Sequence, residues 1–208
     1  MAELLAALAI IGILTAAASP VFVRMMRDDR VGSVGNQIAG VYRVARTRAL
    51  GRGTCVMVRW DKNHGGPTTS DPSGRFTIVE AMVSMGGGTG GGAPAVVPMP
   101  SSNCTGTDWT DAAQTRIVAG FHDLAPQYEP SEAKLYVSDS GGTESEPTTC
   151  EVVFSPRGRT FIRVPGTGFL PLRAVVRIAV ENKQTTFVRN VVVPPNGGAR
   201  VTSGKVNP

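Results

Sequence analysis

The residues that could perform chemistry in this chain are few and scattered. The two histidines, His64 and His122, lie in unrelated polar stretches. No Cys-x-x-Cys or His-Glu pair has the spacing of metal ligands. The glycine-rich run 86–92 lacks the Gly-Lys-Ser/Thr ending of a phosphate-binding loop and leads into prolines rather than into a helix. We therefore expect no catalytic residue, no metal site and no cofactor, and we do not expect an enzyme.

The three cysteines allow one disulfide bond and leave one thiol. Cys104 and Cys150 both lie in polar, loop-like sequence, whereas Cys55 lies in an apolar run and is predicted to be buried. We therefore favour a bond between Cys104 and Cys150. Such a bond suits a domain that is exported beyond the cytoplasmic membrane, where the environment is oxidising.

Three arginines stand close together late in the chain, which has a net charge of +5 and a pI of about 9.5. Arg157, Arg159 and Arg163 fall in and just after a turn. Charged residues that alternate with apolar ones are typical of the solvent face of a half-buried strand, which is the simpler interpretation. The alternative is that these three side chains contact nucleic-acid phosphates, and both interpretations stay open.

One acid, Glu3, precedes the longest apolar stretch of the sequence. Residues 4–23 are twenty positions without a charge, and residues 24–30 then bring five charged side chains. At about 1.5 Å per residue, a helix of this length spans about 30 Å, the thickness of a bilayer's hydrocarbon core. A cleaved signal peptide would have positive charge before a shorter apolar core, so a membrane-spanning helix is favoured.

The helix is predicted to continue beyond the membrane. Apolar residues recur at steps of three and four, which places them on one helix face: Val31, Val34, Ile38, Val41, Ala45 and Ala49. We expect one helix from about Ala2 to Leu50, with residues 1–23 in the membrane and 24–52 as an amphipathic continuation. Pro20 removes one backbone donor and should kink or loosen this helix.

After Gly53 the apolar period changes to two, which predicts a β-rich globular domain over residues 53–193 and a loosely ordered tail over 194–208. The expected strands are Thr54–Trp60, Phe76–Val83, Thr115–Ala119, Lys134–Val137, Glu151–Phe154, Thr160–Val164, Val175–Val180 and Thr186–Val193. The 25 glycines and 15 prolines suit a turn-rich β domain. The predicted fold class is therefore α+β, a long N-terminal helix packed on an antiparallel sheet or sandwich.

Several segments are similar to a known family. Glu3-Leu4-Leu5, Ala-Ile-Ile-Gly-Ile-Leu at 9–14 and Pro20 resemble the N-terminal helix of type IV pilins and type II secretion pseudopilins. The helix end Ala-Arg-Thr-Arg-Ala-Leu-Gly-Arg-Gly at 45–53 and the hairpin Val-Phe-Ser-Pro-Arg-Gly-Arg at 153–159 resemble the GspH/FimT-type minor members. The middle of the chain shows no such likeness.

The sequence departs from the family at its start. In the family the glutamate is the fifth residue of the mature chain and follows a short basic leader that ends in glycine, whereas here it is third. Two explanations stay open: the chain is recorded from an internal methionine, or the leader and two further residues have been trimmed. If Met1 were the true start, prepilin peptidase would have no site to cut.

The resemblance implies a minor pilin or pseudopilin that assembles through its N-terminal helix into a type IV pilus or a type II secretion pseudopilus. Glu3 and Pro20 would be its assembly residues, with Glu3 attracting the N-terminal amine of the next subunit. Its partners would be major and minor pilin-like subunits, the inner-membrane assembly platform and prepilin peptidase. It would reside in the bacterial inner membrane, with its domain in the periplasm, until it enters a filament.

Two other functions are weighed against this one. A FimT-like minor pilin would bind DNA for natural transformation, through the arginines at 157, 159 and 163. An enzyme on a membrane anchor is the least favoured, because no group of catalytic residues emerges.

Overall fold

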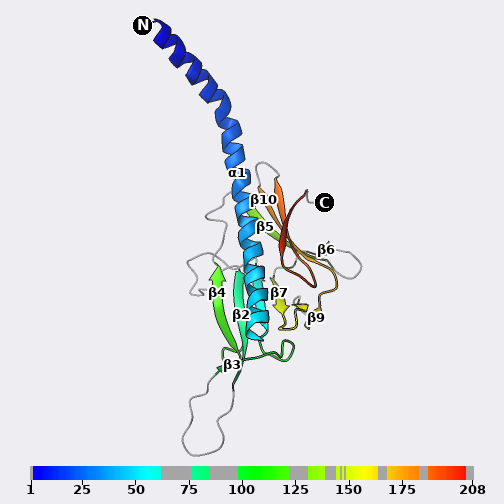
Figure 1. Cartoon of the computed structure of the whole chain (residues 1–208). Coiled ribbons are helices and arrows are strands. Elements are labelled where there is room, and N and C mark those ends of the chain that lie inside the picture. The colour runs from blue at the N-terminus through cyan, green and yellow to red at the C-terminus, as the bar shows by residue number, and fades with distance from the viewer. Residues whose placement is uncertain are drawn as a thin grey trace, which may run out of the picture.

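The computed structural model describes residues 2–61, 76–84, 98–121, 131–138, 144, 145, 147, 149–163, 168–182 and 187–204. These residues form one long helix followed by strands (Figure 1). The strands are β1 (Val56–Asp61), β2 (Phe76–Ser84), β3 (Pro98–Pro100), β4 (Thr115–Phe121), β5 (Ser131–Ser138), β6 (Glu144–Ser145), β7 (Thr149–Phe154), β8 (Thr160–Arg163), β9 (Leu170–Pro171), β10 (Val176–Asn182), β11 (Val188–Val193) and β12 (Arg200–Ser203). The predicted glycine-rich loop at 86–92 lies outside the described residues.

Helix α1 (Ala2–Arg52) confirms the prediction of a single helix that runs through both parts of the N-terminal region. Pro20 lies inside it, and Figure 1 shows a gently curved helix rather than a broken one. Gly53 follows the last turn with a φ of 65°, the left-handed conformation that commonly ends helices. The first half of α1 projects away from the domain, and the second half lies against the strands (Figure 1).

The strands form two antiparallel sheets. One has the order β3-β2-β1-β7-β8-β9, with β4 also paired to β2, and the other has the order β12-β11-β10-β5-β6. Strand β1 lies between β2 and β7, so it is central, and Val58 stands opposite Ile78 on one side and Val152 on the other. The predicted α+β arrangement of a long helix and antiparallel sheets is confirmed.

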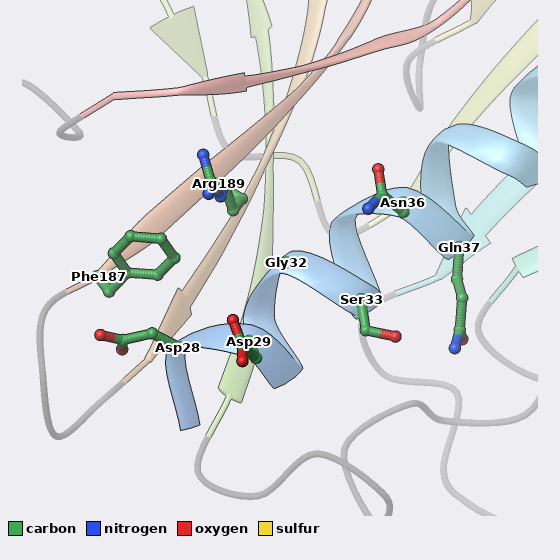
Figure 2. A pocket seen from close by; sticks show the side chains of 8 residues that line it. All are labelled: Asp28, Asp29, Gly32, Ser33, Asn36, Gln37, Phe187 and Arg189. Carbon is green, nitrogen blue, oxygen red and sulfur yellow. The ribbon is translucent and has the colours of Figure 1, made fainter. Parts of the chain in front are cut away.

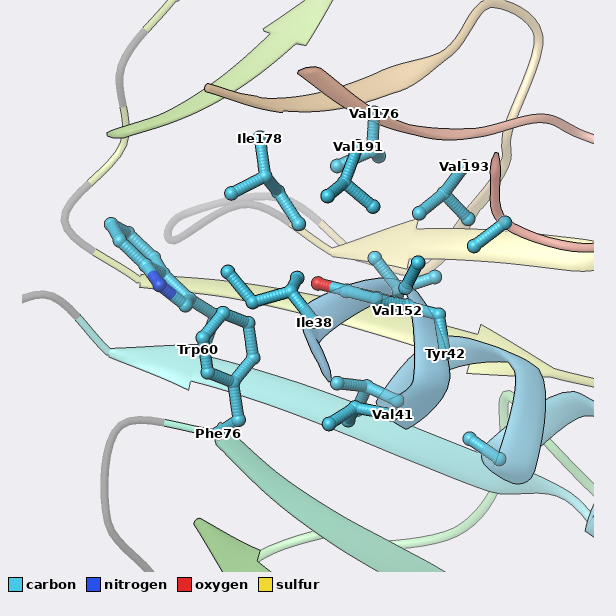
Figure 3. Close-up of a cluster of buried hydrophobic side chains, with 14 of the residues drawn as sticks. Ile38, Val41, Tyr42, Trp60, Phe76, Val152, Val176, Ile178, Val191 and Val193 are labelled. Carbon is cyan, nitrogen blue, oxygen red and sulfur yellow. The ribbon is translucent and has the colours of Figure 1, made fainter. Parts of the chain in front are cut away.

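The second half of α1 supplies the centre of the main core. The predicted helix face is buried, because Val31, Val34, Ile38, Val41, Ala45 and Ala49 are each at most 6% exposed. Tyr42 packs edge-on against Phe76 and Phe154, with ring centroids 6.4 Å apart in each pair. Side chains of both sheets meet these helix residues in one cluster (Figure 3). Helix and sheets therefore form one hydrophobic core.

The prediction of a loosely ordered tail is wrong for part of the segment 194–208. Arg200–Ser203 form β12, which pairs with β11, and Val201 stands opposite Val191. The backbone carbonyl of Ala199 accepts a hydrogen bond of 2.7 Å from Arg43 Nε of the helix. The tail is held because its backbone completes a sheet edge and its apolar residues lie over the helix.

The predicted disulfide bond is also wrong, because the structure joins Cys55 to Cys104. Cys55 points away from the helix, whereas Cys150 is buried in the helix-facing core and is a free thiol. The Cys55 amide also donates a 2.8 Å hydrogen bond to the Ser101 carbonyl, which brings the segment that holds Cys104 alongside β1. Apolar neighbours showed that Cys55 is buried, but they did not show on which face of the strand it lies.

The disulfide bond attaches a second, smaller core to the face of the sheet away from α1. Trp109 is 3% exposed there and packs with Met57, Val79 and Val153. Its indole Nε1 donates a 3.1 Å hydrogen bond to the Cys104 carbonyl. The central strands are thus covered on both faces, by the helix on one side and by segment 101–114 on the other.

Candidate functional site

The projecting half of α1 exposes an almost unbroken apolar surface. Its large apolar side chains are 41–69% exposed: Leu8, Ile10, Ile11, Ile13, Leu14, Val21, Phe22, Val23, Met25 and Met26. None of its apolar window is buried against the domain, and the helix is long and apolar enough to cross a membrane. Soluble proteins rarely leave such a continuous surface in water, which favours lipid or other apolar helices as its cover.

The two predicted assembly residues both lie on this projecting half but are far apart along it. Glu3 lies in the first turn of α1, where a carboxylate interacts favourably with the positive end of the helix dipole. Pro20 follows seventeen residues later, which is about 26 Å along the axis. Both side chains are exposed, so the structure leaves them accessible to a partner and does not bring them together.

At the other end of α1, a buried carboxylate lies among three arginines. Glu80 of β2 is fully buried, and its Oε2 accepts hydrogen bonds of 2.9 Å from Arg48 and 2.7 Å from Arg116. Arg52 Nε lies 2.8 Å from Glu80 Oε1, as an ion pair without hydrogen-bond geometry. Arg48 and Arg52 come from the helix and Arg116 from β4, so Glu80 fastens the end of the helix to the sheet.

This cluster stabilises the fold and is not an acid–base site. Burial is the largest single influence and raises the pKa of Glu80, but the hydrogen bonds from Arg48 and Arg116 and the charges of Arg48 and Arg52 outweigh it. The resulting pKa lies below the ordinary 4.5, so the group stays ionised near neutral pH. Glu80 was not among the predicted site residues, although an acid inside the apolar run Phe76–Val83 was a signal.

The three arginines considered for nucleic-acid contact divide into two groups. Arg163 NH1 lies 3.3 Å from Glu151, and its guanidinium stands over the ring of Phe169 at 5.4 Å. Its guanidinium is therefore already engaged, and Glu151 is shared with Arg59, whose Nε lies 2.9 Å from Glu151 Oε1. Arg157 and Arg159 are exposed and, among the described residues, form no ion pair.

Arg157 and Arg159 line a cavity of about 290 Å³ between the β7–β8 turn and the disulfide-bonded segment. The other residues that line it are Ser102, Asn103, Cys104, Thr105, Ser155, Pro156 and Phe161. Gly158 of the turn has a φ of 79°, and its amide donates a 3.0 Å hydrogen bond to the Ser155 carbonyl, as the predicted hairpin requires. The structure thus brings two of the three arginines together beside polar groups.

Neither metal chemistry nor thiol chemistry is indicated in the part of the chain that the structure describes. No group of three His, Cys, Asp or Glu residues there could hold a metal ion. Burial, with a smaller contribution from Glu151, raises the pKa of Cys150 to about 12, which keeps it a protonated thiol. His64 and His122 lie outside the described residues.

Comparison of the chain with protein-family models, with curated proteins and with solved structures finds no match.

Proposed function

We propose that this protein is a membrane-anchored minor pilin or pseudopilin, a subunit that assembles through the first half of α1 into a type IV pilus or a type II secretion pseudopilus. The observation that carries the proposal is the division of α1 into two halves. The first half is an exposed apolar helix, called the apolar rod below, and the second half is packed into the core of the domain. When the apolar rod leaves the lipid, another apolar surface must cover it in place of the lipid. The corresponding helices of neighbouring subunits provide such a surface.

The acid at the start of the rod supports an assembly role. A carboxylate at the edge of the hydrocarbon region is costly unless it is paired or neutralised. The N-terminal amine of a neighbouring subunit is a partner of opposite charge that would set the axial position of one rod against the next. We assign this role to Glu3, with Pro20 adapting the helix to its neighbours.

Contact between two family-like motifs also supports the proposal. A Cβ atom on Gly158 of the hairpin motif would lie 3.4 Å from Arg46 NH2 of the helix-end motif. The segments 45–53 and 153–159 therefore lie against each other, although about a hundred residues separate them in sequence. A long-range contact of this kind is a reason for both motifs to occur in one fold.

The proposed location follows from the same features. The apolar rod anchors the chain once in the inner membrane, and the domain faces the periplasm, where a disulfide bond such as Cys55–Cys104 is stable. The partners are then pilin-like subunits, the inner-membrane assembly platform and prepilin peptidase. The role is structural: the subunit primes, caps or joins a filament.

The Glu3→Ala variant tests this function. We expect it to remain in the membrane fraction, because the apolar rod is unchanged, but to enter sheared filaments at least about tenfold less than the parent chain. The measurement is the amount of the chain in sheared filaments relative to the membrane fraction, by immunoblot. Glu3→Asp keeps the charge and serves as the control. Equal incorporation of Glu3→Ala, or a full-length chain that stays in water without detergent, would contradict the proposal.

DNA binding is the second candidate function, and the cavity beside Arg157 and Arg159 favours it. Replacing both arginines by glutamine should weaken binding to duplex DNA and reduce the salt dependence of log K by about 2, one per lost phosphate contact. Arg163→Gln is the matched control, because that guanidinium already contacts Glu151 and the ring of Phe169. Fluorescence anisotropy at several salt concentrations measures both quantities. An absence of binding by the parent chain at low salt would end this alternative.

A further inference from the structure

The cavity of about 290 Å³ beside the β7–β8 turn is rich in hydrogen-bond donors and contains no acid. Arg157 and Arg159 supply two guanidiniums, and neither has a carboxylate partner in the described part of the chain. Three hydroxyl groups and one side-chain amide complete the polar lining. The lining therefore carries a net positive charge, which favours an anionic group.

Ser155 places a buried donor in this cavity. The residue is 8% exposed, and its Oγ accepts a 3.1 Å hydrogen bond from the Arg159 amide. A hydroxyl group that accepts one hydrogen bond still has its own hydrogen to donate. Within the described residues no group accepts that hydrogen. A buried donor without an acceptor costs free energy, and an oxyanion in the cavity would remove this cost.

Both walls of the cavity are held in place by the fold. In the turn, the Ser155 amide donates a 2.9 Å hydrogen bond to the Arg159 carbonyl, and the Gly158 amide donates a 3.0 Å hydrogen bond to the Ser155 carbonyl. On the other side, the disulfide bond attaches Cys104 to β1, and the Cys104 carbonyl accepts the hydrogen bond from Trp109. The polar groups are thus positioned before a ligand enters, which lowers the ordering cost of binding.

The larger pocket between α1 and β11, of about 660 Å³, has a different lining (Figure 2). It combines the carboxylates of Asp28 and Asp29 with the guanidinium of Arg189. Asp28 accepts a hydrogen bond from Asn182, and Arg189 stands over the ring of Phe187. Because it carries charges of both signs, and two of them are engaged within the fold, this pocket does not favour one class of ligand.

Pro156 and Phe161 add an apolar section to the lining of the smaller cavity. An inorganic ion would leave this section uncovered, whereas an organic anion would cover it. A volume of about 290 Å³ is at the lower end of the range for ligand pockets. The cavity therefore suits a small ligand with one charged group and one apolar part.

We propose that this cavity binds the oxyanionic group, a phosphate or a carboxylate, of a small organic ligand. The guanidiniums of Arg157 and Arg159 bind its oxygens through charge-assisted hydrogen bonds, and Ser155 donates its remaining hydrogen. Phe161 contacts the organic part. The site does not depend on the filament role, so either proposal can fail without the other.

The test is an NMR titration of the full-length chain in detergent with phenyl phosphate and with benzoate, against chloride at equal ionic strength. The amides of Thr105 and Arg157, one on each wall, should shift together with a single dissociation constant. The probe that binds more tightly identifies the oxyanion as a phosphate or a carboxylate. Arg157→Gln and Arg159→Gln should each weaken binding about tenfold, the effect of one lost charge-assisted hydrogen bond.

Arg163→Gln is the matched control for this titration. It removes the same charge from the same hairpin, but Arg163 does not line the cavity and its guanidinium contacts Glu151 and Phe169, so the dissociation constant should not change. Three results would overturn the site: no saturable shift with either small anion, equal weakening by Arg163→Gln, or shifts caused by duplex DNA but by neither small anion. The last result would indicate that the arginines contact a nucleic-acid backbone.

Discussion

Glu80→Gln is expected to lower the free energy of unfolding by about 3 kcal/mol, although the change removes one charge and almost no volume. Breaking a buried ion pair from one side usually costs 3–5 kcal/mol, because the remaining charges lose their partner. Here three guanidiniums would face one another around a neutral amide. We take the low end of that range because the side chains of Arg48, Arg52 and Arg116 are 27%, 42% and 47% exposed, so water screens part of the repulsion.

Urea unfolding of the full-length chain in detergent, followed by tryptophan fluorescence, measures this loss. Asp29→Asn is the control. It also removes one carboxylate, but from an exposed site, so it should change the free energy of unfolding by no more than about 0.5 kcal/mol. An equal effect of the two variants would show that the Glu80 cluster contributes no more than an ordinary surface charge.

The Glu80 carboxylate also makes the free energy of unfolding of the domain depend on pH in the acidic range. Its pKa in the folded protein lies below the ordinary 4.5, so the ionised group stabilises the fold fully above that pH. This contribution is lost as the pH falls through the lower folded-state pKa. Urea midpoints measured from pH 6 downwards should therefore fall more steeply for the parent chain below about pH 4.5 than for Glu80→Gln. Parallel curves for the two proteins would contradict this assignment.

Replacing both Cys55 and Cys104 by serine is expected to cost about 4 kcal/mol, the second large effect. The bond closes a loop with a sequence separation of 49 residues, and the chain-entropy model gives stabilisation of this size for such a loop. The loss should first expose segment 101–114, so Trp109 fluorescence should shift toward that of a solvated indole.

Peptide mapping of the unreduced chain checks the pairing itself. It should recover Cys55 joined to Cys104, with Cys150 alkylated only after unfolding, because that thiol is 2% exposed. The double serine variant supplies the control, since a reducing agent should destabilise the parent and leave the variant unchanged. A peptide that joins Cys104 to Cys150 would restore the pairing favoured by the sequence.

Apolar periodicity predicted the helix and the strands that build the core. The steps from Val31 to Ala49 identified the buried helix face, and each of the eight predicted strands has a counterpart in the structure. Strands β3, β6 and β9 were missed, because strands of two or three residues arise from pairing with a neighbour and not from a pattern of their own. Strand β12 was missed for a related reason, since the edge that holds it is formed by β11.

The candidate site was predictable in its exposed parts and not in its buried contacts. The length of the stretch without charged residues was enough to identify the apolar rod and the acid before it. The partners of Glu80, Cys55 and Arg163 depend on which strands become neighbours and on which face each side chain lies. Residue type showed that Arg157 and Arg163 are charged, but only the position of Glu151 beside Arg163 separates them.

The continuity of α1 has a mechanical consequence. Tyr42 and Ile38 lie on the same uninterrupted helix as the bare apolar stretch, and both are at the centre of the main core. No linker separates the two halves of α1, so the domain cannot rotate independently of the first half of the helix. A force applied to the first half of α1 is transmitted directly to the interior of the domain. A rotation of that half about the helix axis turns every outward-facing surface of the domain by the same angle.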